Sequence, residues 1–444
     1  MPDFPLVFRV RQRFDDPHLD DVPGEVERQL ARLSLAGRIK PGQSVAITAG
    51  SRGITNVQQI LKAIVDHLKR LGAQPFIVPA MGSHGGGTAA GQRRIIESYG
   101  ITEAFCGCPI RSSMDTVVVC EADEGFAVHF DKHAFGADHV VVCNRVKPHT
   151  LFCGDVESGL MKMMLIGLGK HDGARIYHRA FKDHSFGRIV RSVAGQVLAR
   201  CNIVAGVAIV ENSYGQTARI EAVAPGEFEV REMALLAAAR QWLPRLPFQH
   251  VDVLLVDQIG KNISGSGLDV NVVGRKHLLH RAADDEYPKV KIIGVRDLTD
   301  LTSGNAAGIG LVEFCRSRVL RKMDVDLTRT NILTGGHCAE AMLALDYETD
   351  EQMLEWMLRQ IGLTDPPDAK LLWIRNTRDL AEVQCAAAYL DEARDRADLE
   401  ILTDPRPLPF DADGNLSDDH MKSAAVGPER DDGKLPSAAS AAHR

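Results

Sequence analysis

The sequence predicts an α/β protein of two domains, with mainly parallel, helix-covered sheets and an active-site cleft between the domains. Three observations favour this class. A chain of 444 residues is longer than one ordinary hydrophobic core supports. Apolar runs of strand length alternate with segments of helical periodicity, which is typical of parallel sheets. Hydrophobic residues make up 45% of the chain and charged residues 25%, as in ordinary globular proteins.

The first strand-helix units begin near residue 43. The run VAIT at 45–48 predicts a strand, and residues 56–71 carry apolar side chains at helical spacing and stop before Gly72. A second strand is expected at 75–81, followed by the turn SHGGGT. The next helix, at 89–99, is expected to be capped by Thr88 and closed by Gly100. This βαβα order predicts a parallel sheet covered by helices.

The rhythm continues to about residue 403. Strands are predicted at 139–145, 203–210, 251–257 and 291–295, and later a helix at 351–363, a strand at 370–377, a helix at 377–394 and the strand-like LEILT. We place an N-terminal catalytic and cofactor-binding domain at 1–264 and a C-terminal α/β domain at 265–410. Residues 411–444 lack aromatic side chains and contain few large apolar ones, so we expect a disordered tail.

Charge and hydropathy exclude several classes of partner. The net charge is −7 without a long block of Lys and Arg, so nucleic acid is not expected as a partner. No stretch approaches the roughly 20 apolar residues that a membrane helix needs, and the first residues lack a signal-peptide pattern. We therefore expect a cytoplasmic protein without a membrane partner. The nine cysteines are scattered and odd in number, which indicates reduced thiols.

The segment MGSHGGGT places His84 directly after a predicted strand, where a side chain can enter the crevice at a sheet's carboxyl edge. The backbone amides of Gly85, Gly86 and Gly87 could approach an anion such as a phosphate, next to the start of a helix. The alternative is a flexible turn with an incidental histidine. The segment is neither a Walker loop nor a GxGxxG motif.

A second segment, between residues 144 and 181, is dense in proton-transferring and nucleophilic side chains: Lys147, His149, Glu157, Lys162, Lys170, His171 and His178. Imidazole exchanges protons near neutral pH, and a lysine in apolar surroundings can become nucleophilic or be modified covalently. The alternative takes the Met and Leu residues of MKMMLIGLG as core and Lys162 as a surface side chain. Lys170 and His171 either bind an anionic group or are solvated turn residues.

Four motifs, in order, resemble the signature of the nickel-pincer lactate racemase superfamily. They are SRGIT with Arg52, the turn containing His84, KPHT with His149, and SGLMK with Lys162 followed by His178 sixteen residues later (178 − 162). The resemblance implies that Arg52 binds the substrate carboxylate and that His84 and His149 form an acid/base pair. It also implies that Lys162 carries the nickel-pincer nucleotide covalently and that His178 binds its nickel. GSGLDVNVVGR resembles a loop of the second domain and makes Arg275 a further substrate contact.

The resemblance implies an isomerase that inverts C2 of an α-hydroxyacid, as a racemase or 2-epimerase. The histidines would move the hydroxyl proton, while hydride passes to and from the cofactor through a 2-oxo acid intermediate. The implied partners are a small-molecule α-hydroxyacid and the enzymes that synthesise the cofactor. Ala49 stands where the lactate enzyme has an acidic residue, which is a departure from the family's pattern. The size and polarity of the pocket decide between a short aliphatic acid, a dicarboxylate and a sugar acid, and the motifs do not distinguish these classes.

Two functions of other classes compete with this interpretation. A hydrolase could bind zinc or another divalent metal through His84, His149 and His178 and activate water with Glu157. A noncatalytic nucleotide-binding protein could use Gly85–Gly87 alone, with structural histidines. Only the racemase requires modification of Lys162 or a closely bound pincer cofactor.

Overall fold

The computed structural model describes residues 4–51 and 53–417, which divide into two compact units. The N-terminal unit is Asp16–Trp242, and the C-terminal unit combines 4–15 with 243–417. The division therefore falls earlier than the boundary expected near residue 265, and the first strand of the chain belongs to the C-terminal unit. The α/β class with mainly parallel, helix-flanked sheets is confirmed, as is the division into two parts.

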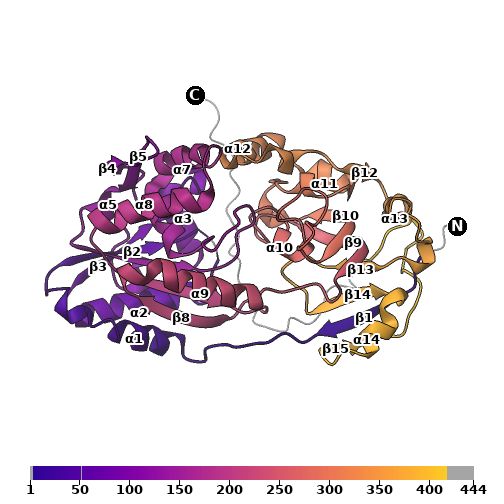
Figure 1. The fold of residues 1–444 in the computed structure, drawn as a ribbon, viewed down its shortest axis with the longest axis horizontal. Helices are drawn as coiled ribbons and strands as arrows, with labels where there is room; N and C mark the ends of the chain where they lie inside the picture. The colour runs from indigo at the N-terminus through magenta and orange to yellow at the C-terminus, as the bar shows by residue number, and fades with distance from the viewer. Residues whose placement is uncertain (1–3, 52, 418–444) are drawn as a thin grey trace. The chain divides into compact units, whose positions relative to one another are not determined.

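The sheet of the N-terminal unit has five strands in the order β3-β2-β6-β7-β8. Figure 1 labels β2, β3 and β8 of this sheet. The first four strands run parallel and β8 pairs antiparallel with β7. The strands are β2 (Ser44–Ala49), β3 (Gln74–Pro79), β6 (His139–Arg145), β7 (Ile203–Glu211) and β8 (Thr217–Val223), and a separate hairpin is formed by β4 (Thr116–Glu121) and β5 (Ala127–Asp131). The predicted strands at 45–48, 75–81, 139–145 and 203–210 are confirmed.

Both faces of this sheet are buried, which explains the uninterrupted apolar runs of its strands. Val45 and Ile47 of β2 belong to one hydrophobic cluster, and Ala46 between them belongs to another on the opposite face. The helices are α1 (Val22–Ala31), α2 (Val57–Arg70), α3 (Ala89–Ser98), α4 (Glu103–Cys106), α5 (Lys132–Phe135), α6 (Leu160–Lys162), the π-helical η3 (Met163–Gly167), α7 (Leu168–Ala180), α8 (Phe186–Arg200) and α9 (Phe228–Gln241). Thr88 caps α3 as predicted, because its Oγ1 accepts a hydrogen bond from the Gly91 amide.

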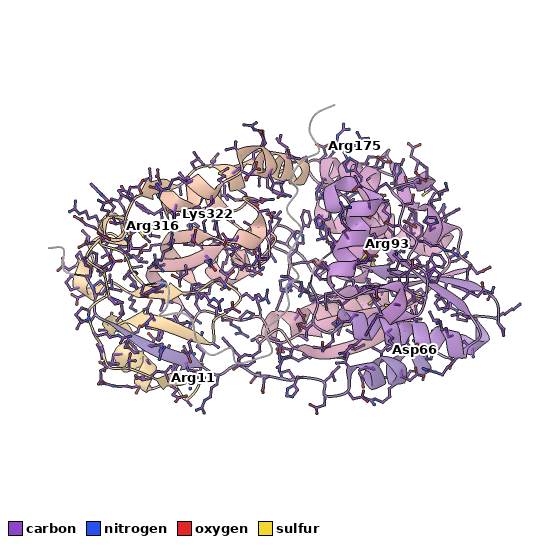
Figure 2. All side chains as sticks on the ribbon, turned by 180° about the vertical axis from the view of Figure 1, so that it is seen from behind. Arg11, Asp66, Arg93, Arg175, Arg316 and Lys322 are labelled. Atoms are coloured by element: carbon purple, nitrogen blue, oxygen red, sulfur yellow. The ribbon has the colours of Figure 1, made fainter. Side chains whose placement is uncertain are left out.

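The sheet of the C-terminal unit has eight strands in the order β12-β11-β10-β9-β13-β14-β1-β15. The pairs from β12 to β13 are parallel, whereas β14, β1 and β15 are antiparallel. The strands are β1 (Val7–Gln12), β9 (His250–Ile259), β10 (Lys289–Leu298), β11 (Phe314–Arg316), β12 (Leu345–Tyr347), β13 (Leu371–Ile374), β14 (Glu382–Ala386) and β15 (Leu399–Ile401). Arg11 of β1, labelled in Figure 2, pairs with Glu382 of β14 and Glu400 of β15.

The helices of this unit are α10 (Val270–Val273), α11 (Ser317–Lys322), α12 (Val325–Gly335), α13 (Asp350–Leu358) and α14 (Leu390–Arg394). The prediction of a helix at 377–394 was wrong for its first part. Residues Glu382–Ala386 form the strand β14, which pairs with β13 on one side and β1 on the other. Alanine-rich sequence favours a helix, but two neighbouring strands satisfy the backbone of this segment as a central strand.

The tail predicted to be disordered from residue 411 begins too early. Leu416 is buried, and its amide donates a hydrogen bond to Asp350 Oδ2 over 2.9 Å. Residues 411–417 therefore pack on the C-terminal unit, and the rest of the predicted tail lies outside the described residues. All nine cysteines are free thiols, as expected. No helix in the described ranges is both long and apolar enough to cross a bilayer.

Candidate functional site

The carboxyl ends of three parallel strands lie at one edge of the N-terminal sheet. The central strand β2 pairs in parallel with β3 on one side and with β6 on the other. Ser51 follows β2, His84 follows β3 and His149 follows β6, so the three residues leave the sheet at the same edge. Ligands of open α/β sheets bind in the crevice outside this edge. The topology therefore brings together two sequence-predicted residues from distant parts of the chain.

His84 lies at the start of a turn that requires glycine. Gly85, Gly86 and Gly87 all have left-handed backbone conformations, with φ of 68°, 67° and 62°. A Cβ at Gly91 would lie 1.9 Å from the Gly85 carbonyl oxygen, so the turn presses directly on the first turn of α3. The predicted anion cradle coincides with this turn, and its binding role stays a prediction.

The His84 ring is exposed and oriented by Ser51, whose Oγ lies 2.5 Å from His84 Nδ1. The turn also packs against the segment that carries Lys162 and His178. A Cβ at Gly82 would lie 3.0 Å from Ile166 Cγ2, and one at Gly87 would lie 3.5 Å from His171 Nδ1. The two motif-rich segments predicted from the sequence are thus neighbours in the fold.

His149 lies in a loop that is held by Glu157. The buried Glu157 carboxylate accepts a hydrogen bond from the His149 amide over 2.6 Å and one from the Gly154 amide over 3.3 Å. Arg240 of α9 lies 2.8 Å from the same carboxylate and forms an ion pair with it. Because both carboxylate oxygens are bound, Glu157 stabilises the loop and is poorly placed to activate water.

The loop also determines the tautomer of His149. Nδ1 lies 3.0 Å from the Leu151 amide nitrogen and 3.2 Å from that of Phe152, and both amides donate to it. A nitrogen that accepts two hydrogen bonds carries no proton, so the proton of the neutral ring is on Nε2. His149 in this loop conformation is therefore a hydrogen-bond donor through Nε2.

Phe152 lies at the centre of three sequence-predicted residues. Its ring centroid is 4.4 Å from that of His149 and 6.4 Å from that of His178, both nearly parallel to it, and Lys162 Nζ lies 6.0 Å from it. Phe181 and Phe186 pack on the same ring. Aromatic packing of this kind restricts the rotation of the two imidazoles. The structure thus gathers His149, Lys162 and His178 within one unit, around a side chain that the sequence analysis did not single out.

The short helix that carries Lys162 begins at a buried carboxylate. Glu232 of α9 accepts a hydrogen bond from the Met161 amide over 2.9 Å, and a Cβ at Gly159 would overlap its carboxyl group. Burial raises the pKa of Glu232 to about 7, while the Met161 and Leu160 amides oppose that shift. No local pattern marks this residue, because its partner lies 71 residues away in the chain (232 − 161).

Two predicted substrate contacts have different outcomes. Arg52 lies outside the described residues. Arg275 is buried, and its guanidinium forms a two-pronged ion pair with Glu313, with nitrogen-oxygen distances of 2.6 and 3.1 Å. It also donates to the Leu311 carbonyl over 2.8 Å. These bonds hold Arg275 inside the C-terminal unit, and its contact with a substrate stays a prediction.

The geometry does not favour the hydrolase alternative. Among residues 4–51 and 53–417, no three His, Cys, Asp or Glu side chains form a group that could bind a metal ion. The proposed water activator, Glu157, is occupied by two amides and Arg240. Glu157 is therefore poorly placed for the role that the hydrolase alternative gives it.

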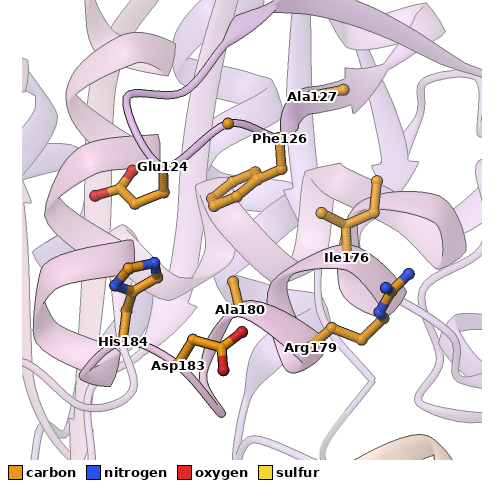
Figure 3. A pocket seen from close by; sticks show the side chains of 9 residues that line it. Glu124, Phe126, Ala127, Ile176, Arg179, Ala180, Asp183 and His184 are labelled. Atoms are coloured by element: carbon orange, nitrogen blue, oxygen red, sulfur yellow. The ribbon is translucent and has the colours of Figure 1, made fainter.

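A pocket of about 500 Å³ lies on α7, between that helix and the β4–β5 turn (Figure 3). Its lining includes Phe126 and, at helical spacing, Ile176, Arg179 and Asp183. His178 lies on another face of α7, where it contacts Phe181 and Phe152. None of the sequence-predicted site residues that the structure describes lines this pocket, so it is separate from the part of the candidate site described above.

Comparison with known proteins supports the architecture. Residues 39–226 match a family model described as a domain of unknown function, DUF362. The structure of the lactate racemase apoprotein from Thermoanaerobacterium thermosaccharolyticum superposes with a TM-score of 0.51 over 83% of this chain and 94% of that one, at 13% identity. The chain shares the lactate racemase fold. This likeness confirms at the level of the fold the resemblance that four short motifs indicated.

Two further comparisons add no functional argument beyond the lactate racemase fold. A crystal structure of a Thermotoga maritima protein superposes with a TM-score of 0.47 and 11% identity, over 82% of this chain and 97% of the other. No curated protein matches the sequence. Assignment of chemistry therefore depends on the residues at the sheet edge.

Proposed function

We propose that the protein is a racemase or 2-epimerase of an α-hydroxyacid that uses a nickel-pincer nucleotide attached to Lys162. The observation that carries the proposal is the convergence of His149, Lys162 and His178 on the Phe152 ring, with the His84 turn packed on the same segment. These residues occupy the motif positions of a family whose fold the chain shares.

The residues at this site fit the implied cofactor. Lys162 is partly buried, and Phe152 offers a flat apolar wall beside its side chain. The imidazole of His178 would hold the nickel of the cofactor, because imidazole suits nickel as a ligand. When bound, the cofactor would supply the hydride chemistry at the substrate Cα.

The chain's own residues perform the proton chemistry. His84, oriented through Nδ1 by Ser51, accepts the hydroxyl proton as Cα becomes planar. His149 donates a hydrogen bond from Nε2 to the substrate oxygen on the other side. To return a proton from Nε2 to that oxygen, and afterwards to accept one there, the ring must carry a proton on Nδ1, which requires Nδ1 to leave the Leu151 and Phe152 amides. Inversion in both directions requires His84 and His149 to exchange the roles of proton acceptor and proton donor. This exchange is therefore coupled to movement of the His149 loop.

The proposed substrate is an α-hydroxyacid because its carboxylate suits an arginine at the site. A carboxylate next to the carbinol carbon stabilises the complex when an arginine binds it, and Arg52 occupies the motif position for that contact. The partners we propose are a small α-hydroxyacid and the enzymes that synthesise and load the cofactor.

The test is intact-protein mass spectrometry with peptide mapping and metal analysis, on protein produced with nickel and the cofactor-making enzymes. We expect an adduct on Lys162 with stoichiometric nickel, and inversion at C2 when α-hydroxyacids are screened by chiral chromatography. Lys162→Ala should lose the adduct and the activity, whereas Lys132→Ala, a change at an exposed lysine of the same unit, should keep both. An unmodified Lys162 with stoichiometric zinc would refute the proposal and favour a hydrolase.

A further inference from the structure

Lys170 is a lysine whose charge lies fully inside the N-terminal unit. Its side chain is 0% exposed, and so is that of Asp131, whose Oδ2 lies 3.0 Å from Lys170 Nζ. Nζ also donates to the Pro79 carbonyl and to Gln92 Oε1. Three acceptors around one nitrogen match the three donors of an ammonium group. The sequence suggested either an anion-binding role or a solvated turn position for Lys170. In the structure Lys170 is instead a buried lysine with internal partners.

The three acceptors come from three different parts of the unit. Pro79 ends β3, Gln92 lies in α3, and Asp131 ends β5 and caps α5. Burial lowers the pKa of Lys170, and the adjoining Asp131 carboxylate opposes that shift. A buried charge is retained only where such partners compensate the lost hydration.

The backbone at Lys170 is also unusual. Its φ of 56° and ψ of −157° interrupt the helical stretch between the π-helical segment η3 and the rest of α7. A non-glycine residue in this region is strained and persists only when its surroundings hold it there. Lys170 lies eight residues after Lys162 and eight before His178 (170 − 162 and 178 − 170). The kink thus separates the proposed attachment site from the proposed nickel ligand.

Gln92 connects this ammonium to the His84 turn. The Gln92 side chain is fully buried, accepts from Lys170, and donates through Nε2 to the Gly82 carbonyl over 2.8 Å and to the His84 carbonyl over 3.4 Å. Lys170 and Gln92 together bind the backbone at the start and the end of the segment from Pro79 to His84.

We propose that Lys170 is a positioning residue that, through Gln92, fixes the place of the His84 imidazole relative to the helix that carries His178. The inference rests on the proposed function for its effect on catalysis, but its effect on His84 is independent of the reaction. A displacement of about 1 Å in a proton-transferring group lowers the rate by roughly a hundredfold. The ammonium therefore contributes to turnover without touching the substrate.

The test changes Gln92, because that leaves the Lys170–Asp131 ion pair in place. Gln92→Glu keeps the shape and the acceptor for Lys170 but removes both donations to the turn, and Gln92→Leu removes all three bonds. The matched control is Gln12→Leu in the C-terminal unit, where a buried glutamine likewise donates to two backbone carbonyls, of Leu380 and Arg245. Two readouts are compared: the ¹H–¹⁵N signals of the His84 imidazole, assigned with a His84→Gln variant, and kcat and KM of the loaded enzyme.

We expect both Gln92 variants to shift the His84 signals and to lower kcat ten- to a hundredfold, with KM within twofold of wild type and the Lys162 adduct intact. Gln12→Leu should leave the His84 signals and kcat unchanged. Wild-type His84 signals in Gln92→Glu would overturn the inference. Because the imidazole signals need no turnover, a protein without racemase activity but with shifted signals would refute the proposed function and support the positioning role.

Discussion

The carboxyl group of Glu232 should make the stability of the N-terminal unit depend on pH. Burial raises its pKa to about 7 from an ordinary 4.5, and the difference corresponds to about 3 kcal/mol. Because the folded-state pKa is the higher one, the protonated carboxyl group favours the folded state. This contribution is complete below pH 4.5 and is lost as the pH rises through 7.

Glu232→Gln should remove that dependence, because the amide oxygen can accept the Met161 hydrogen bond without ever ionising. Relative to wild type, the variant should gain about 3 kcal/mol in the free energy of unfolding between pH 4.5 and pH 8. Hydrogen exchange of peptides from β7, followed by mass spectrometry, measures the stability of this unit, and comparison of the two proteins at one pH cancels the intrinsic exchange rates.

Glu229→Gln is the matched control, on the same helix but with a side chain that is 42% exposed and paired with Arg191. Exposed ion pairs contribute about 0–1 kcal/mol, and the Glu229 charge is only a minor cause of the raised Glu232 pKa. This variant should therefore stay within about 1 kcal/mol of wild type at both pH values. A difference between Glu232→Gln and wild type that stays constant from pH 4.5 to pH 8 would refute the reasoning.

Three further outcomes are expected. Glu157→Gln should release the His149 loop, so that the His149 Nδ1 resonance in ¹⁵N NMR moves away from that of a doubly hydrogen-bonded acceptor; an unchanged resonance would contradict the role given to the carboxylate. Phe152→Leu should lower stability by about 1–3 kcal/mol, measured by hydrogen exchange of α8, and should lower turnover more than Phe105→Leu, a change at an exposed phenylalanine. Arg275→Met should destabilise the C-terminal unit by about 3 kcal/mol, measured by exchange of β9, without altering the Lys162 adduct; loss of substrate affinity at unchanged stability would instead restore its predicted role.

Much of the N-terminal sheet could be predicted from local sequence. The strand predicted at 139–145 has the bounds of β6, and that at 203–210 differs from β7 by one residue. These strands are buried on both faces, so their apolar runs are continuous and their helices are amphipathic. Hydrophobic periodicity does not predict a strand whose formation depends on pairing with a distant segment. The sequence of β14 has a helical pattern, and Val7–Gln12 was not predicted as a strand. These two strands pair with each other although they lie far apart in the chain.

The residues of the candidate site also fall into two groups, those marked by local motifs and those known only from their contacts in the fold. His84, His149, Lys162 and His178 could be found because short motifs mark them in order along the chain. Their supporting residues, Gln92, Glu157, Glu232 and Phe152, have roles that depend on contacts no local pattern shows. The contacts of Arg275 likewise could not be predicted. Its motif position suggests a substrate contact, whereas the structure shows its ion pair with Glu313.

The place of β1 has a consequence for biosynthesis. Its neighbours β14 and β15 emerge from the ribosome only after about 370 further residues (382 − 12), which at about 5–20 residues per second takes roughly 20 to 70 seconds. During that interval Val7, Phe8 and Val10, which end at 0–1% exposure, have no sheet to join. The apolar segment of β1 therefore stays unpaired in the nascent chain while the N-terminal unit is synthesised and folds. Deleting residues 4–15 would damage the C-terminal unit, most of which is translated hundreds of residues later.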